Sequence, residues 1–139
     1  MAAMSDFLEA ELLDHVLNND SYTSPTIVYL ALYTTATTDA GGGSEVPNLY
    51  SYARYAVDSS TSNKWTVSSP GGTATNNADF AFPAASGGNW GVVEWVAITT
   101  SATYGGGSFL LHGQLTAPRT INDGDTFEFA SGDFVVTFA

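Results

Sequence analysis

The chain has 139 residues, a length typical of one domain, with 14 Asp or Glu against only 3 Lys or Arg and a formal net charge of −11 at pH 7. Phosphate recognition requires clustered cations, whereas Arg54, Lys64 and Arg119 are scattered, so we expect no nucleic-acid partner. The absence of Cys excludes disulfides and thiolate metal sites. No apolar run reaches the roughly 18 residues of a membrane-spanning helix, and residues 1–6 lack the basic segment of a signal peptide.

An amphipathic helix is predicted from Ser5, a suitable N-cap, to about Asn18. Three apolar residues at i, i+4 spacing form a row along it: Leu8, Leu12 and Val16. A helix of this length is marginal when isolated. We therefore expect the row to pack either on the chain's own sheet or on a neighbouring subunit, and the sequence leaves both possibilities open.

From Thr26 onward the apolar pattern has the period of two that is typical of strands. About eight strands are predicted, at residues 26–35, 50–57, 64–67, 79–82, 90–100, 108–115, 126–130 and 134–138, with a further short segment at 119–121 after a break at Pro118. Residues 37–49 and 68–76 read as loops, and the last two strands read as a pair joined by a turn. The pattern predicts a mainly β fold for residues 1–139, a single-domain antiparallel β-sandwich of jelly-roll or Greek-key kind with one N-terminal helix.

The sequence contains no motif for catalysis, metal binding or a cofactor. His15 and His112 stand without the spacing of metal ligands, and no Ser lies in a nucleophile elbow. Glu94 and Glu128 fall within strand patterns that mark no cleft, and Asp123-Gly-Asp125 is typical of a β-turn rather than of a calcium loop. We predict no catalytic residue, no metal site and no cofactor.

Aromatic and basic residues are candidates for contacts with other proteins. Trp90 and Trp95 should lie on opposite faces of one strand, one of them in the core and the other covering the second face or forming an interface. The complete set of candidate interface residues is Leu8, Leu12, Val16, Tyr52, Arg54, Trp90 and Arg119. Carbohydrate stacking on the tyrosines is a weaker alternative to packing.

Several segments follow one another along the chain in a characteristic order. They include Asp6-Phe-Leu-Glu-Ala-Glu-Leu-Leu-Asp-His-Val-Leu17, Tyr22-Thr-Ser-Pro25, Val28-Tyr-Leu-Ala-Leu-Tyr-Thr34, Ser51-Tyr-Ala-Arg54, Trp90-Gly91 and Leu110-Leu-His-Gly-Gln-Leu115. Over nearly its whole length the chain resembles a family of small virion proteins of tailed bacteriophages, often labelled tail fibre proteins. The resemblance implies a non-enzymatic structural protein of the virion with no catalytic residues to carry over.

Two placements on the virion compete. In the first, the protein decorates the capsid exterior as a cement protein, a homotrimer that binds over junctions of the major capsid protein. In the second, it belongs to the tail as a fibre, adaptor or tip component. A chain without fibrous repeats or heptads makes a poor fibre by itself, so the sequence favours the capsid. A host-glycan-binding module is a third reading, which the sandwich fold permits without implying.

Overall fold

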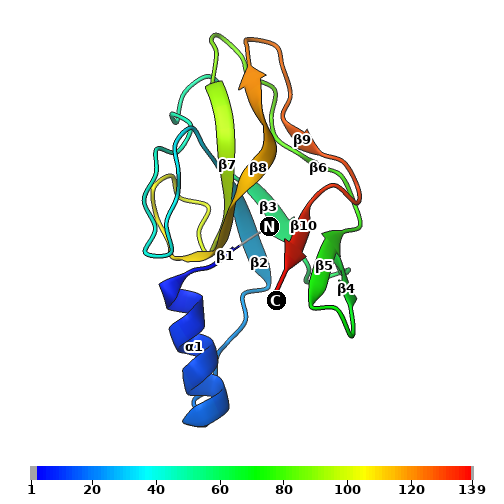
Figure 1. Cartoon of the computed structure of the whole chain (residues 1–139). Coiled ribbons are helices and arrows are strands. Elements are labelled where there is room, and N and C mark those ends of the chain that lie inside the picture. The colour runs from blue at the N-terminus through cyan, green and yellow to red at the C-terminus, as the bar shows by residue number, and fades with distance from the viewer. Residues whose placement is uncertain (1–2, 139) are drawn as a thin grey trace.

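Ten strands and one helix make up the regular structure of residues 3–138 in the computed structural model (Figure 1). The ends of the predicted 1–139 domain, residues 1–2 and 139, lie outside the described part. In chain order the elements are β1 (Ala3–Met4), α1 (Asp6–Leu17), β2 (Ile27–Tyr33), β3 (Tyr55–Asp58), β4 (Trp65–Ser68), β5 (Thr73–Asn76), β6 (Phe80–Ala81), β7 (Gly91–Thr99), β8 (Phe109–Ile121), β9 (Glu128–Phe129) and β10 (Val135–Thr137).

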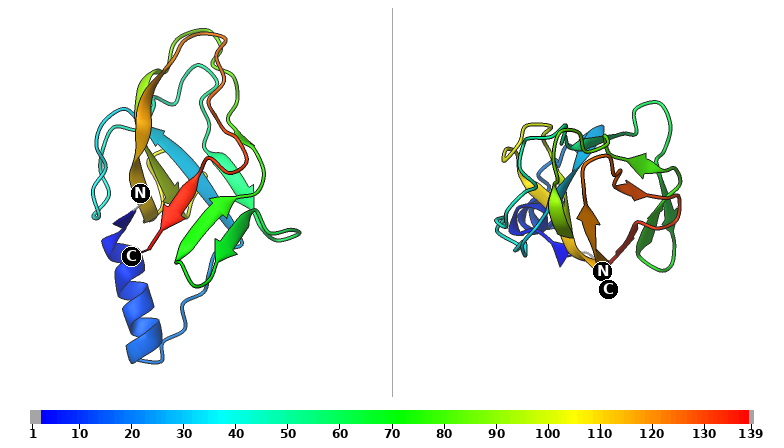
Figure 2. Two further views of the ribbon diagram at one scale, coloured as in Figure 1. Left: turned by 45° about the vertical axis from the view of Figure 1, so that its right-hand side comes forward. Right: turned by 90° about the horizontal axis from the view of Figure 1, so that it is seen from above.

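All strand pairs within the described residues are antiparallel. The largest sheet has the order β1-β8-β7-β2-β3, and two smaller sheets have the orders β10-β5-β4 and β6-β9. The two smaller sheets together face the large one (Figure 2), which makes the architecture a mainly β sandwich, as predicted. The strands with the strongest sequence signal, β2 and β7, pair at the centre of the large sheet, where both faces are covered.

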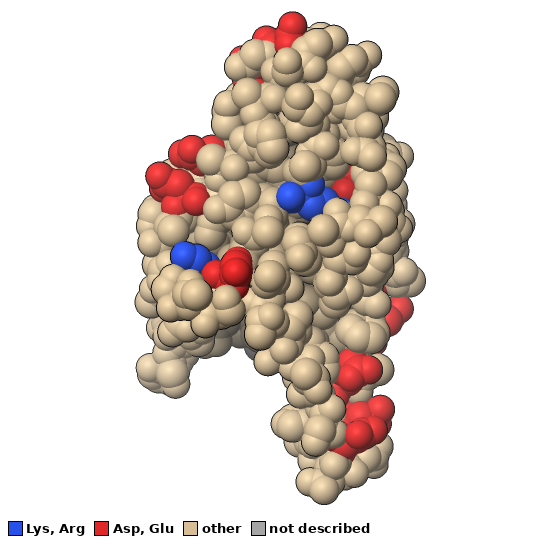
Figure 3. All heavy atoms as spheres, turned by 180° about the vertical axis from the view of Figure 1, so that it is seen from behind, with Lys and Arg blue, Asp and Glu red and all other residues tan. Residues whose placement is uncertain are grey.

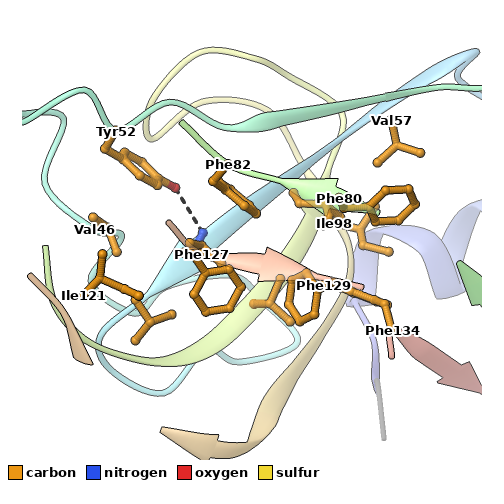
Figure 4. Packing of buried hydrophobic residues seen from close by; sticks show 14 of the residues in the cluster. Val46, Tyr52, Val57, Phe80, Phe82, Ile98, Ile121, Phe127, Phe129 and Phe134 are labelled. Atoms are coloured by element: carbon orange, nitrogen blue, oxygen red, sulfur yellow. Dashed lines mark hydrogen bonds between the residues drawn. The ribbon is translucent and has the colours of Figure 1, made fainter. Parts of the chain in front are cut away.

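The core lies between the large sheet and the smaller sheets. Phenylalanines from the smaller layer share one core cluster with Leu30 of β2 and with Ile98 of β7 (Figure 4). Many of the rings meet edge to face: the centroids of Phe129 and Phe134 are 4.7 Å apart with planes at 73°. Such pairs add about 0.5–1.5 kcal/mol each beyond the burial of their area, so the aromatic layer is a major source of stability.

An irregularity in the pairing of β7 with β8 changes which side chains of β7 face the core. The pairing with β8 shifts register between Val93 and Trp95, so that Val93 and Val96 both enter the core, whereas Val92 is exposed. The period of two predicted for the strand at residues 90–100 is therefore interrupted at this irregularity. The two tryptophans lie on opposite faces as predicted: Trp90 packs in the main core, and Trp95 packs against Ala97 on the outer face.

Three strand predictions need correction. Residues 50–54 are not strand, because Tyr50 and Ser51 adopt φ of 54° and 65° and form a turn before β3. Residues 68–76 are not all loop, because Thr73–Asn76 forms β5 and pairs with β4. The break expected at Pro118 does not occur, because this residue lies in the stretch of β8 between Gln114 and Arg119 that has no partner on β7, where no ladder N–H is needed.

The chain termini also pair differently from the prediction. The last two strands do not form a hairpin: β9 pairs with β6, and β10 pairs with β5. The short strand β1, which no sequence pattern predicted, pairs with β8 at Leu111 and His112. Both corrections involve strands of two or three residues, which are too short to show a clear alternation.

The predicted helix at residues 5–18 is confirmed. The Oγ of Ser5 accepts a hydrogen bond from the Leu8 N–H, and Asn18 caps the other end. The helix projects away from the sandwich, and only its first half lies against the sheet (Figure 1). Leu8 is buried and Leu12 is half-buried against the core, but Val16 is 74% exposed. The chain's own sheet therefore covers only part of the apolar row.

Candidate functional site

A buried ion pair joins the loop after β2 to the segment before β3. The Arg54 guanidinium holds the Glu45 carboxylate with two hydrogen bonds of 2.8 Å, from Nε to Oε1 and from Nη2 to Oε2. The two side chains are only 2% and 4% exposed. Tyr52 extends the pair, because its hydroxyl donates to Glu45 Oε1 at 3.0 Å and accepts from the Leu32 N–H. Bidentate geometry of this kind compensates much of the cost of burying both charges.

The same ion pair holds the loop between β7 and β8. The Nη1 atom of Arg54 donates to the backbone oxygens of Ser101 and Gly106, both at 2.8 Å. The Gly105 N–H donates to Glu45 Oε2. Burial lowers the pKa of Arg54, but the hydrogen bonds and charge of Glu45 outweigh this effect and raise that pKa overall. The arrangement fixes both loops against the sandwich.

A second polar cluster consists of Thr37, His112 and Asp39. In the neutral imidazole of His112, Nε2–H donates to Asp39 Oδ1 at 2.9 Å and Nδ1 accepts from the Thr37 hydroxyl at 2.8 Å. A hydrolase triad uses the same residue types, with an accessible nucleophile and a buried carboxylate. Here the placement is reversed, because Thr37 is 5% exposed and the Asp39 side chain is 59% exposed. The cluster is suited to anchoring the loop that carries Thr37 and Asp39 to β8, not to attacking a substrate.

The polar groups of the interior are satisfied internally. Among residues 3–138, every buried side-chain nitrogen and oxygen has a hydrogen-bond partner. In the same part of the chain, no three His, Asp or Glu side chains gather as metal ligands, and no helix has the length and apolarity needed to cross a membrane. His15 closes the end of α1, with its Nδ1 3.0 Å from the backbone oxygen of Asp20.

A groove of about 390 Å³ lies between β8 and β10. Its walls combine aliphatic and aromatic side chains such as Ile98 and Phe134 with one cation and one anion, Arg119 and Asp133. The Arg119 guanidinium is already engaged, because it lies 5.1 Å from the Phe127 ring centre and donates to the Glu128 backbone oxygen at 2.7 Å. The groove is a recess beside the sandwich edge, and His112, which also lines it, is engaged with Thr37 and Asp39.

The most distinctive exposed surface is the far half of α1. Leu13, Val16 and Leu17 are 59%, 74% and 73% exposed, and we call these three residues the helix tip surface. They lie within one and a half turns of one another at i, i+3 and i+4 spacing, so their side chains form one continuous apolar strip. On the face of the molecule that Figure 3 shows, acidic side chains lie along one edge of the projecting helix.

The structure separates the candidate interface residues into two groups. Tyr52 and Trp90 are 5% and 3% exposed and belong to the core, and Arg54 is buried in the ion pair. These three side chains are covered by the chain itself, and the interface role expected of them stays a prediction. Val16 is exposed, and Arg119 lies at the groove.

Leu13 and Leu17 complete the apolar strip of α1, but they were not among the candidate interface residues predicted from the sequence. They lie beside the i, i+4 row of Leu8, Leu12 and Val16, and the signal that identifies them is position along the helix. Residues near the N-terminus of α1 touch the sheet, and apolar residues near its C-terminus are left without a covering element. Sequence reasoning also missed Glu45, which stands in a glycine-rich segment with no strand pattern.

The family comparison agrees with this picture of a structural protein. A search of curated proteins finds no match to the chain. A family model described as Podophage GP4 fiber I protein gp80 matches residues 3–137, nearly the whole chain. The match spans the projecting helix, the sandwich and both buried polar networks, and it shows that this protein belongs to that family of phage fibre proteins.

Proposed function

We propose that the protein is a non-enzymatic component of the tail fibre of a podophage. The observation that carries the proposal is the family match over residues 3–137. The site geometry supports it, because the two polar clusters that resemble chemical sites both serve to fix loops. The Arg54–Glu45 pair is buried, and Thr37 is closed off from substrate. What remains accessible is a rigid sandwich with a projecting helix.

The fibre placement replaces capsid decoration as our preferred reading. The family match names a fibre protein and gives no support to a cement role over the major capsid protein. Our argument from the sequence, that a chain without repeats makes a poor fibre, treated the fibre as one protein. A fibre can instead be assembled from several compact proteins, each joined to the next by a small docking element. Assembly as a homotrimer remains part of this proposal.

Phage particles that lack the gene distinguish the two placements. The fibre proposal predicts full heads that release DNA at the same temperature as wild-type particles but adsorb poorly to host cells. Adding the purified protein should restore adsorption. If the mutant heads instead release DNA at a clearly lower temperature and adsorb normally, the protein stabilises the capsid and the fibre proposal is wrong.

A further inference from the structure

The three faces of α1 have different surroundings. At about 100° per residue, Leu8 and Leu12 point toward the sandwich, where Leu8 is buried and Leu12 is half-buried. Glu11 and Asp14 lie on a second face, and the helix tip surface lies on a third. The second and third faces carry their side chains largely into solvent, because the far half of the helix extends beyond the sheet (Figure 2).

The end of the helix is well ordered by its own hydrogen bonds. The Asn18 side chain donates to Asp14 Oδ1 at 2.7 Å, and the Asn18 N–H donates to the Asp14 backbone oxygen. His15 ties the returning chain to the helix through the Asp20 oxygen. These bonds keep the helix tip surface in place without covering it. Apolar anchors at i, i+3 and i+4 spacing on a rigid helix are the pattern by which helices enter hydrophobic grooves.

The charges around the helix tip surface argue against a second copy as the occupant. Helix α1 carries four carboxylates, Asp6, Glu9, Glu11 and Asp14, and no Lys or Arg precedes Arg54 in the chain. Two such helices side by side would bring eight carboxylates together, four from each copy, with no cation to offset them. Elsewhere in the chain, Arg54 is buried in its pair with Glu45 and Arg119 donates to the Glu128 oxygen, which leaves the Lys64 ammonium of each copy against these carboxylates. A complementary partner must supply the positive charge itself.

We propose that the helix tip surface inserts into an apolar groove with a basic rim on a different protein of the virion. Leu13, Val16 and Leu17 would fill the groove, and Glu11 and Asp14 would meet the Lys or Arg residues along its rim. This inference rests on the proposed function, because it assigns the contact by which the fibre component is held on the particle. It predicts binding that is both apolar in its core and sensitive to salt.

The test measures rebinding of purified protein to phage particles that lack it. Wild-type protein should bind these particles saturably. The triple variant Leu13→Ser, Val16→Ser and Leu17→Ser should bind at least about 100-fold more weakly, because three large side chains no longer leave water. The matched control is Val67→Ser on β4, since Val67 is 73% exposed and apolar but lies away from the helix. Its affinity should stay within about twofold of wild type.

A charge variant tests the basic rim separately. Glu11→Gln with Asp14→Asn should weaken binding about tenfold at low salt, and added NaCl should weaken the wild type more than this variant. Wild-type binding that does not change with salt would overturn the proposal that the groove has a basic rim. Circular dichroism should show that all variants keep the wild-type fold, because every substituted side chain lies at least partly in solvent.

The outcomes separate this inference from the fibre proposal. If wild-type protein binds and the triple variant binds equally well, the helix is not the contact, and the fibre proposal stands. If sedimentation shows that wild-type protein self-associates and the triple variant does not, the occupant is a second copy and the inference is wrong. If wild-type protein binds no particle at all, both proposals are overturned.

Discussion

Replacing Arg54 with Ala should lower the free energy of unfolding by about 3–5 kcal/mol, the range for breaking a buried ion pair by removing one partner. The guanidinium donates two hydrogen bonds to Glu45 and three more to Thr99 Oγ1 and the oxygens of Ser101 and Gly106. Without it, a carboxylate that is 4% exposed keeps only Tyr52 and the Gly105 N–H as donors. The magnitude comes mainly from this uncompensated charge.

The assay is urea unfolding followed by tryptophan fluorescence. Lys64→Ala serves as the control, because it also removes one cation but its ammonium is exposed and bonded only to Ser62. Its free energy of unfolding should change by less than about 0.5 kcal/mol. The double variant Glu45→Met with Arg54→Met should be more stable than Arg54→Ala, since it leaves no unpaired charge. If Arg54→Ala and Lys64→Ala unfold within about 1 kcal/mol of each other, the pair does not hold the two loops.

Three further predictions follow from single side chains or glycines. Asn76→Ala should lower the free energy of unfolding by about 2–4 kcal/mol in the same assay, because the Asn76 amide makes hydrogen bonds with five buried or half-buried backbone groups. A loss below about 1 kcal/mol would contradict this reasoning. Burial raises the pKa of Tyr33 to about 12, whereas a tyrosine in the unfolded chain has a pKa of about 10. As the pH rises, the unfolded chain therefore loses this proton before the folded chain does, and the free energy of unfolding falls between about pH 10 and 12. Tyr33→Phe should reduce that fall by about 2–3 kcal/mol, and equal losses in both proteins would refute the cause. A Cβ at Gly88 would lie 2.6 Å from the Tyr50 ring, whereas one at Gly71 meets only Ser68 Oγ at 3.5 Å, so Gly88→Ala should lower the melting temperature by several degrees more than Gly71→Ala.

Local signals in the sequence predicted the elements that depend on neighbouring residues. The cap at Ser5, the helix after it, and the central strands around Leu30 and Val96 all follow from residues within one or two turns or strand repeats. The sandwich itself follows from the number of such segments. The irregular pairing of β7 with β8 could not be predicted, because it depends on how Val93 and Trp95 meet the partner strand β8.

The buried ion pair shows why the surroundings of Arg54 could not be predicted from the sequence. Arg54 was expected at an interface, because an isolated cation in an acidic chain suggests a contact with another molecule. Its partner, Glu45, lies nine residues earlier beside a run of glycines, and the loop that completes the site lies about fifty residues later. No local pattern links these segments. The helix face was more accessible to prediction, since spacing alone identifies Leu12 and Val16 as one row.

The most direct test of the central claim is a cryo-electron microscopy reconstruction of the complete virion. The fibre account predicts density at the tail that accepts the sandwich as a rigid body, with the projecting helix α1 directed into a neighbouring protein of different sequence. Density for the sandwich on the outer surface of the capsid, with none at the tail, would contradict the account.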